Sequence, residues 1–344
     1  MAIYLTRRAL TAMPFALAAG SAFAAEGDLL EGAKKEGQLV WYTTLVVGQI
    51  VRPLIARFEK KYPGVKVSYV PAPWQETAVR ILNEGRAGQP KGDLFDGGST
   101  VYPLDKAGFV QTYLVESAAG FPAAFRDPKG LWTANIIQPS TPAVNTDQVK
   151  AADIPKTYED LLLPRWKGRM AWPDSPSVSG PPGLIGNILI AMGQDKGMEY
   201  LEKLAAQKIA NVPSNQRVVL DQNIAGQYPL VLHIYNYHAA ISATEGAPVE
   251  WLKLPPTMVS FGSMGLVKNS PHPNAAKLFL EFSMSAEGQQ IYADAGYIPA
   301  NPAVPSKTKG LRPEDGNYPA NILSAGDFLT HEAEWLGIYR KMFT

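Results

Sequence analysis

The sequence predicts an α/β fold of two lobes, each a mainly parallel sheet flanked by helices. Strand patterns alternate with helix patterns along the chain, and such alternation produces parallel sheets with helices on both faces. Two proline-rich extended stretches, residues 136–147 and 251–267, interrupt this alternation as connections between domains do. The length of 344 residues also favours two domains over one.

These two stretches divide the chain. We assign residues 25–134 together with residues 257–344 to lobe 1, which is therefore discontinuous, and residues 135–256 to lobe 2. The two extended connections would form the hinge between the lobes.

In the first lobe, the elements follow from the spacing of apolar residues. Ile50, Leu54 and Phe58 recur at helical spacing. Pro53 is compatible with that helix only in its first turn. The predicted elements are a short helix over 28–35, a strand over 38–44, a helix over 48–61, a strand over 65–69, a helix over 75–86 and a very short strand over 93–96.

The second lobe begins with a capping pattern. Thr157 is predicted to cap a helix that starts at Tyr158, with Asp160 three residues beyond the cap. Further elements are a strand over 170–173, helices over 184–192 and 196–207, and a strand that starts at Tyr228. After the second connection, helices are predicted over 274–282 and 287–295.

The N-terminus has the pattern of an export signal over residues 1–24. Arg7 and Arg8 precede a weakly apolar stretch, and the residues up to Ala24 fit a small-x-small cleavage site. The paired arginines fit a twin-arginine signal as well as a general secretory one. Either route takes the protein out of the cytoplasm, and we predict the periplasm.

Composition excludes several classes of function. The formal net charge is +1, so no broad field exists to hold nucleic acid. The chain has no cysteine, which excludes disulfides, thiol catalysis and Cys-ligated zinc. Beyond the N-terminus, no apolar stretch is long enough to predict a membrane span.

The stretch from Tyr228 to His238, YPLVLHIYNYH, is the main candidate for a binding site. An apolar strand ends in Tyr235, Asn236, Tyr237 and His238, and ligands of open α/β sheets bind beyond the carboxyl ends of strands. The same pattern also fits a strand edge whose amphipathic aromatic side chains reach water.

Three loops add candidate residues, because each follows a strand and precedes a helix. Hydroxyls and backbone N–H groups at such helix N-termini suit phosphate, phosphonate or carboxylate, although ordinary capping and turns use the same residues. Trp74 lies near these loops and could form a wall of the site. The loop candidates are Thr43, Thr44, Gly98, Ser99, Thr100, Ser177, Ser179 and Gly180.

Several segments together resemble the type II periplasmic solute-binding proteins of ABC importers, in the group that binds ferric iron, phosphonates, sugar phosphates or thiamine. The segments are EGQLVWYT from Glu36, FEKKYPGVKV from Phe58, PKTYEDLL from Pro155 with WKGR from Trp166, and FGSMGLVKNSPHPNAAK from Phe261 with SAEGQ from Ser285. The resemblance spans nearly the whole chain after the signal. It implies a monomer that binds a small molecule or ion between its lobes, closes by a hinge and delivers the ligand to an ABC permease in the inner membrane.

Two ligand classes follow from this resemblance. Ferric binders of the group usually hold iron with two adjacent tyrosines, often with a histidine from the first loop and a carboxylate. Here Asn236 separates Tyr235 from Tyr237, and the first loop after Thr43 has no histidine, so His238 would be the substitute; His233 lies in an apolar strand as a core residue would. We therefore expect a small oxyanion, with Fe³⁺ as the alternative cargo and no resident cofactor.

An enzyme is the alternative to a binding protein. Ser179 and Gly180 are not part of a Gly-x-Ser-x-Gly nucleophile elbow. Neither a His-Glu-x-x-His motif nor a P-loop motif occurs. The sequence therefore favours a binding protein over a hydrolase.

Overall fold

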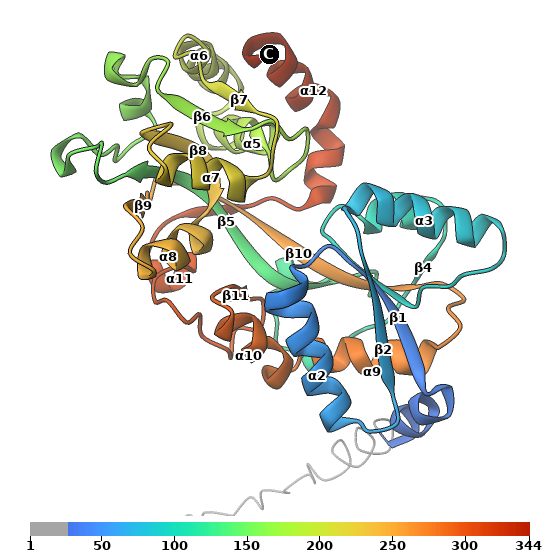
Figure 1. The fold of residues 1–344 in the computed structure, drawn as a ribbon. Coiled ribbons are helices and arrows are strands. Elements are labelled where there is room, and N and C mark those ends of the chain that lie inside the picture. Colours follow the sequence, from blue (N-terminus) through green and yellow to red (C-terminus); the bar gives the residue numbers. More distant parts are fainter. Residues whose placement is uncertain (1–26) are drawn as a thin grey trace, which may run out of the picture.

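The computed structural model describes residues 27–344, so the predicted export signal over residues 1–24 lies outside the described part. One mixed sheet runs through the whole molecule (Figure 1). Its main strands lie in the order β2 (Lys66–Pro71), β1 (Gln38–Thr43), β3 (Leu94–Asp96), β10 (Thr257–Val267), β5 (Thr133–Asn145), β8 (Leu230–Tyr235), β6 (Met170–Pro173) and β7 (Ala210–Val212).

Parallel strands form the two flanks of this sheet, and antiparallel strands form its centre. On one flank β2, β1 and β3 are parallel, and on the other β8, β6 and β7 are parallel. The long strands β10 and β5 pair antiparallel between them. The short strands β4 (Val110–Gln111), β9 (Val249–Trp251), β11 (Ile298–Pro299) and β12 (Ala320–Ile322) pair with β5 or β10.

The α/β prediction with two lobes is therefore confirmed, and the hinge stretches gain a definite structure. Residues 136–147 and 251–267 were expected to be extended connections. The structure places most of them in β5 and β10, which pass from one lobe to the other side by side (Figure 1). Pairing to each other satisfies the backbone groups that an isolated crossing would leave exposed.

The helices predicted for lobe 1 lie close to their expected places. A helix over residues 27–36 precedes β1. The predicted helix over 48–61 is a π-helical turn, η1 (Val47–Val51), continued by α2 (Arg52–Lys61), and Pro53 lies at the start of α2 as expected. The other helices of lobe 1 are α3 (Trp74–Arg86), α4 (Val101–Lys106), α9 (Pro273–Met284), α10 (Ala286–Asp294) and α11 (Pro313–Gly316).

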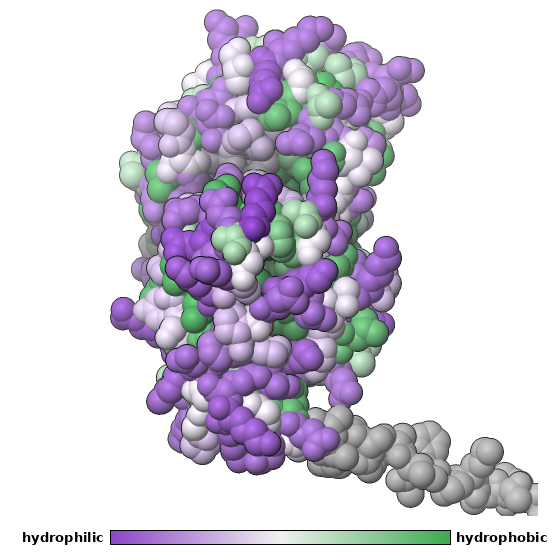
Figure 2. Space-filling view, turned by 90° about the vertical axis from the view of Figure 1, so that its right-hand side faces the viewer, coloured by the Kyte–Doolittle hydropathy of each residue, from purple (hydrophilic) through white to green (hydrophobic). Residues whose placement is uncertain are grey.

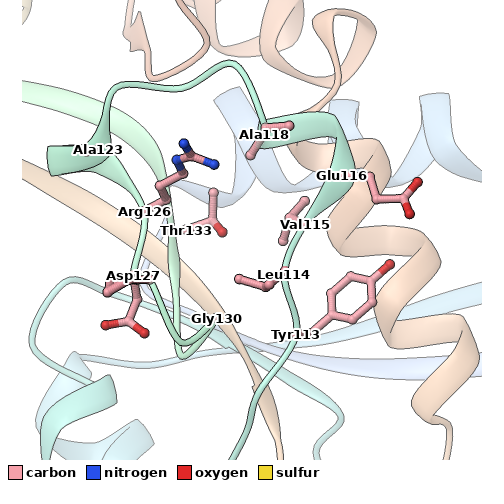
Figure 3. A pocket seen from close by; sticks show the side chains of 12 residues that line it. Tyr113, Leu114, Val115, Glu116, Ala118, Ala123, Arg126, Asp127, Gly130 and Thr133 are labelled. Atoms are coloured by element: carbon pink, nitrogen blue, oxygen red, sulfur yellow. The ribbon is translucent and has the colours of Figure 1, made fainter. Parts of the chain in front are cut away.

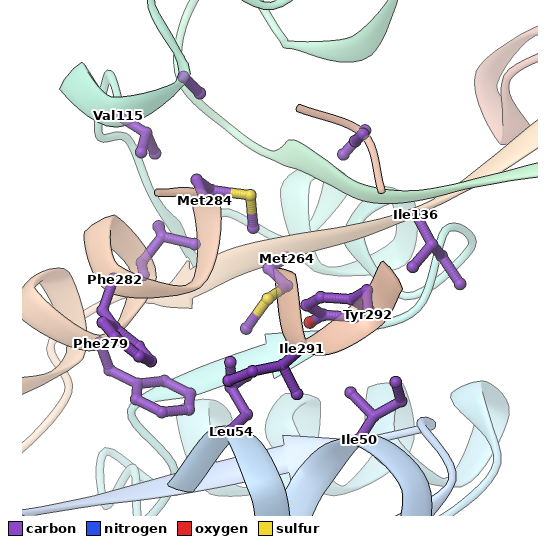
Figure 4. Packing of buried hydrophobic residues seen from close by; sticks show 14 of the residues in the cluster. Ile50, Leu54, Val115, Ile136, Met264, Phe279, Phe282, Met284, Ile291 and Tyr292 are labelled. Carbon is purple, nitrogen blue, oxygen red and sulfur yellow. The ribbon is translucent and has the colours of Figure 1, made fainter. Parts of the chain in front are cut away.

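The main core of lobe 1 joins segments that are distant in sequence. Ile50 and Leu54 pack toward Phe279 and Ile291, which come from α9 and α10 (Figure 4). The returning segment after residue 257 therefore completes the lobe that the N-terminal half begins. The hydrophobic surface buried here provides the usual driving force for such a discontinuous lobe.

The second lobe contains α5 (Pro181–Met192), α6 (Gln194–Ala205), α7 (Gln216–Ile224), α8 (Asn236–Thr244) and the C-terminal helix α12 (Ala325–Phe343). A Cβ atom at Gly186 of α5 would lie 2.5 Å from the Trp335 ring, so α12 packs tightly on α5. Tyr339 donates a hydrogen bond to Asp174 over 2.7 Å. We therefore place α12 with lobe 2, although the sequence assigns all of 257–344 to lobe 1.

The predicted cap at Thr157 forms, but the helix after it is short. The Thr157 hydroxyl accepts a hydrogen bond from the N–H of Asp160 over 3.3 Å, and the Asp160 carboxylate in turn accepts one from the N–H of Thr157 over 2.9 Å. Only one 3₁₀ turn, η5 (Glu159–Leu162), follows. The chain then turns at Pro164, where a helix cannot continue without losing a hydrogen bond.

Candidate ligand site

A pocket of about 200 Å³ lies where the two lobes meet. It takes residues from the ends of β1, β3 and β8 and from the two crossing strands. We call it the phenol pocket, after the three tyrosines in its wall. Its lining residues are Thr44, Leu45, Val46, Asp96, Gly97, Gly98, Asn135, Ile136, Gln138, Tyr235, Tyr237, His238, Gly262 and Tyr297.

The aromatic cluster of the sequence lies on two elements. Strand β8 ends at Tyr235, and α8 begins at Asn236. Tyr235 and Tyr237 therefore do not share a face by strand alternation. They come together because a strand end and the first helical turn meet at a corner.

The rings of this corner are in close contact. Tyr235 and Tyr237 stack with ring centroids 5.4 Å apart and planes 12° from parallel. Tyr297, which follows α10 in lobe 1, lies 5.0 Å from Tyr237. The His238 ring lies 4.5 Å from Tyr237 and nearly perpendicular to it. Phenols from both lobes thus form one continuous wall.

Burial keeps these phenols neutral. It raises the pKa of Tyr235 to about 12, with the neighbouring Ser179 hydroxyl partly offsetting the effect. The pKa of Tyr237 is raised well above its usual value by burial and by the neighbouring Tyr235 and Tyr297, while the Gln138 side chain opposes the rise. Burial raises the pKa of Tyr297 to about 12 as well, and its hydroxyl donates to Gln49 over 3.0 Å. At neutral pH all three are hydrogen-bond donors.

The positive charge near this wall comes from Arg217, in the first turn of α7. Burial, together with this charge, lowers the pKa of His238 to about 4, and the charge limits the rise in the pKa of Tyr297. His238 is therefore neutral at pH 7. Arg217 is held by a hydrogen bond to Ser242 at 3.0 Å and an ion pair with Asp221 at 2.7 Å. His233 is fully buried in β8 and does not line the phenol pocket.

The N-terminal end of α8 adds a partial positive charge. Tyr235 is the N-cap of this nine-residue helix, and its side chain makes no capping hydrogen bond. The N–H groups of an uncapped first turn attract negative charge. The side chain of Asn236 does not line the phenol pocket, because it is buried and donates to the Leu311 carbonyl over 2.8 Å. Only the backbone N–H of Asn236, in the first turn of α8, is left for the ligand contact that the sequence predicts.

Hydroxyls on the lobe 1 side are used within the protein. The backbone N–H and the hydroxyl of Thr44 both donate to the carboxylate of Asp96, the former over 2.7 Å. Thr43 accepts a hydrogen bond from the N–H of Leu45, and Thr100 donates to the Asp96 carbonyl over 2.9 Å. Thr43 and Thr100 are fully buried, so the structure assigns them a supporting role in place of the predicted ligand contact.

Asp96 is the acidic group of the phenol pocket. Complete burial raises its pKa to about 6, and the hydrogen bonds from Thr43 and Thr44 limit the rise. One of its oxygens has no hydrogen-bond partner. Asn135, on β5, is also fully buried and lines the pocket, and neither its amide oxygen nor its amide nitrogen meets the distance and angle limits of a hydrogen bond.

The loop before α5 is not the anion-binding turn that the sequence suggests. Its N–H groups bond within the loop, since Gly180 donates to the Ser177 carbonyl over 3.0 Å, and the helix opens with two prolines that have no N–H. The hydroxyls form a row, with Ser177 and Ser179 3.1 Å apart. We call residues 175–179 the serine loop; none of them lines the phenol pocket, and the Ser179 hydroxyl neighbours Tyr235 of its wall.

The remaining predicted residues lie beside the phenol pocket. Trp74, Ser99 and Ser177 line a second cavity between the lobes, of about 490 Å³. A further cavity, of about 570 Å³, is formed within residues 113–133 of lobe 1 alone, with Arg126 pointing into it (Figure 3). None of the residues predicted for the site lines this third cavity.

Sequence reasoning missed part of the phenol pocket. Tyr297, and Arg217 beside the pocket, come from segments to which it assigned no function; Gln138 lies on a hinge stretch, and Asn135 directly precedes that stretch. Asp96 offered a signal, because it ends a buried strand directly before the predicted loop at Gly97 and Gly98. An acid buried at a strand end needs partners, and such partners mark a site.

Across residues 27–344, no three His, Cys, Asp or Glu side chains lie close enough to share a metal ion. In the same part of the chain, no helix combines the length and the apolar composition needed to cross a bilayer.

A family model for bacterial extracellular solute-binding proteins matches residues 53–317. The chain belongs to this family. A curated relative, the Fe(3+)-binding periplasmic protein of Serratia marcescens, is 24% identical over 289 residues, which are 82% of this chain and 80% of the relative.

Solved structures share the fold of this solute-binding protein. Iron-bound HitA from Pseudomonas aeruginosa matches with a TM-score of 0.74 at 20% identity and covers 89% of this chain and 99% of its own. AfuA from Actinobacillus pleuropneumoniae, a periplasmic binding protein with fructose-6-phosphate bound, matches with a TM-score of 0.70 at 21% identity and covers 89% and 98%. The resemblance to type II binding proteins of ABC importers is therefore confirmed.

Proposed function

We propose that this solute-binding protein captures a small organic oxyanion, a phosphonate, phosphate ester or carboxylate, in the phenol pocket and delivers it to an ABC permease. The observation that carries the proposal is the lobe 2 wall. Neutral phenols of Tyr235 and Tyr237 flank the uncapped N-terminal end of α8, within reach of the charge of Arg217. Each of these features favours negative charge.

Oxyanion binding would proceed through hydrogen bonds and not through a covalent step. Tyr235 and Tyr237 would donate from lobe 2, while Tyr297, whose hydroxyl already donates to Gln49, would contact the ligand from lobe 1 without donating to it. A ligand held by both lobes would stabilise the closed form, which is the form that a permease distinguishes from the open one. We infer a binding role without catalysis, a monomeric state, no nucleic-acid partner and a periplasmic location.

Ferric iron is the second candidate, and a specific observation favours it. The phenol pocket brings together three phenols and the carboxylate of Asp96, all hard oxygen donors suited to a highly charged cation. The name of the relative from Serratia marcescens agrees with this choice. Against it, the Tyr297 hydroxyl bonds Gln49, Tyr235 lies beside Ser179 and Tyr237 beside Gln138, so the three phenols have separate neutral neighbours. The charge of Arg217 also opposes a trivalent cation.

Thermal unfolding with a ligand panel tests the proposal. A ligand that binds only the folded state adds about 2.7 kcal/mol of stability at one hundred times its Kd. Methylphosphonate, phosphate esters or small carboxylates should therefore raise the melting temperature by several degrees. A shift with ferric citrate alone, together with a visible absorption band, would favour iron instead. No shift with any of them would contradict both candidates.

A further inference from the structure

The second cavity between the lobes, which we call the side cavity, is separate from the phenol pocket to which we assign the oxyanion. Its volume of about 490 Å³ falls within the usual range of small-molecule sites, about 300–1,000 Å³. Lobe 1 contributes Trp74 and Tyr102, and α12 contributes Phe328 and Leu329. Two exposed charges of opposite sign, Lys106 and Glu332, also line it. The walls are thus mainly aromatic and aliphatic.

The side cavity adjoins the phenol pocket on both lobes. In lobe 1, Gly98 lines the phenol pocket, and the next residue, Ser99, lines the side cavity. In lobe 2, Ser177 lines the side cavity, and its hydroxyl lies 3.1 Å from that of Ser179, which neighbours Tyr235. In each lobe, neighbouring residues therefore lie beside the two spaces.

Apolar surface is left exposed at this place. Leu329 is 46% exposed, on a helix whose neighbour Phe328 is buried in the core. Figure 2 shows the face that carries α3 and α12. Apolar residues gather there at mid-height, between the upper and lower halves, and hydrophilic residues surround them. A ligand that covers such a surface gains the free energy of burying it.

Tyr102 closes the side cavity toward α12. A Cβ atom at Gly326 would lie 3.0 Å from the Tyr102 ring, so the ring rests on the first turn of α12. Its hydroxyl interacts with Ser324 and with the backbone of Gly326, and burial raises the pKa of Tyr102. This contact joins a lobe 1 helix to α12 and holds a flat aromatic face in the wall.

We propose that the side cavity holds an aromatic ring of the same solute whose oxyanion binds in the phenol pocket. This inference rests on the proposed function and narrows it to aryl oxyanions. Flat faces from Trp74 and Tyr102 suit a planar group, since aromatic rings attract one another in offset or edge-to-face contacts. The charges of Lys106 and Glu332 suit a polar ring substituent but are not required for the ring.

Two probes that differ only in the ring test this proposal by calorimetric titration. Phenylphosphonate should bind the full-length protein about tenfold or more tightly than methylphosphonate, because only the former buries a ring. Leu329→Ser should remove most of that preference while methylphosphonate binds as before, and Trp74→Ala should reduce the preference too. Ile190→Ser, which changes a residue 53% exposed on α5, is the matched control and should leave the preference intact.

The outcomes separate this inference from the proposed function. Equal affinity for the two phosphonates, or a preference that survives both Leu329→Ser and Trp74→Ala, overturns the ring site. If neither phosphonate binds, the oxyanion proposal fails by itself. In that case benzyl alcohol, a neutral ring probe, is followed by saturation-transfer NMR: loss of its signal in Leu329→Ser but not in Ile190→Ser keeps the ring site, and equal signals in both overturn it.

Discussion

The two walls of the phenol pocket use their polar groups in opposite ways. On the lobe 1 side, Thr44 donates both its backbone N–H and its hydroxyl to Asp96. The hydroxyls of Thr43 and Thr100 form hydrogen bonds with backbone groups. On the lobe 2 side, α8 starts without a side-chain cap beside two stacked phenols. The hydroxyls of the first wall are already hydrogen-bonded within the protein. The second wall presents hydrogen-bond donors that remain available to a ligand. Recognition of a ligand should therefore depend much more on lobe 2.

The largest effect is expected from removing the lobe 2 donors. Tyr235→Phe/Tyr237→Phe should weaken methylphosphonate binding by about 1.5–3 kcal/mol for each hydroxyl that contacts the anion, while the rings still pack. Tyr228→Phe changes a tyrosine outside the phenol pocket and is the control. Titration calorimetry measures all three proteins. Unchanged affinity in the double variant would remove this wall from the site.

A smaller effect is expected from distorting the serine loop that supports this wall. A Cβ atom at Gly180 would lie 1.8 Å from the Ser175 carbonyl oxygen, so Gly180→Ala must displace the loop. We expect a loss of about 1–3 kcal/mol of stability, the usual cost of overpacking. A Cβ atom at Gly120 meets no atom within 4 Å, so Gly120→Ala is the matched control. The midpoints of urea unfolding compare the two variants. Equal midpoints would show that the loop shifts without loss of stability.

The lobe 1 wall should make ligand affinity depend on pH. The pKa of Asp96 is raised to about 6, so its carboxyl gains a proton and loses its charge as pH falls through 6, while His238, with a pKa near 4, stays neutral. Affinity for dimethyl phosphate, whose charge is constant here, should therefore rise from pH 7 to pH 5, by at most about tenfold per pH unit. Asp96→Asn should abolish the rise, and Asp195→Asn on α6 should keep it.

Affinity that falls toward pH 5 would argue against this assignment. Protons compete with ferric iron for the carboxylate and the phenols, so the affinity for iron should fall as pH falls. A falling affinity is therefore the change expected for a metal site. The pH profile thus separates the two ligand classes through the one acidic group of the phenol pocket.

The smallest effect concerns the distance between the two walls. If both lobes hold the ligand, saturating methylphosphonate should reduce the radius of gyration measured by X-ray scattering. The change is small because the lobes stay joined through β5 and β10. A profile identical with and without bound ligand would show that one wall suffices and that no hinge closure occurs.

Much of the fold could be predicted because its signals are local. Apolar spacing located α2, α3 and α9, and proline-rich extended patterning located the two crossings. The position of α12 could not be found in this way, since its Trp335 packs against Gly186 of a helix almost 150 residues earlier. Local patterns do not say which lobe a terminal helix joins.

The site was predictable only in part for the same reason. Tyr235 and Tyr237 stood out because polar aromatics followed an apolar strand. Tyr297 lines the phenol pocket and Arg217 lies beside it, each from a separate segment, and nothing near them in sequence marks them. Asn236 lies between two lining residues yet turns into the core, because α8 begins there and changes the direction of successive side chains.

Native mass spectrometry tests most directly that the phenol pocket takes an organic oxyanion. Protein freed of ligand by unfolding and refolding is mixed with equimolar methylphosphonate, phenylphosphonate, a phosphate ester, a small carboxylate and ferric citrate. We predict an adduct with the mass of an organic oxyanion, absent from Tyr235→Phe/Tyr237→Phe and present in Tyr228→Phe. An adduct with the mass of iron, or no adduct with any member of the mixture, would contradict this account.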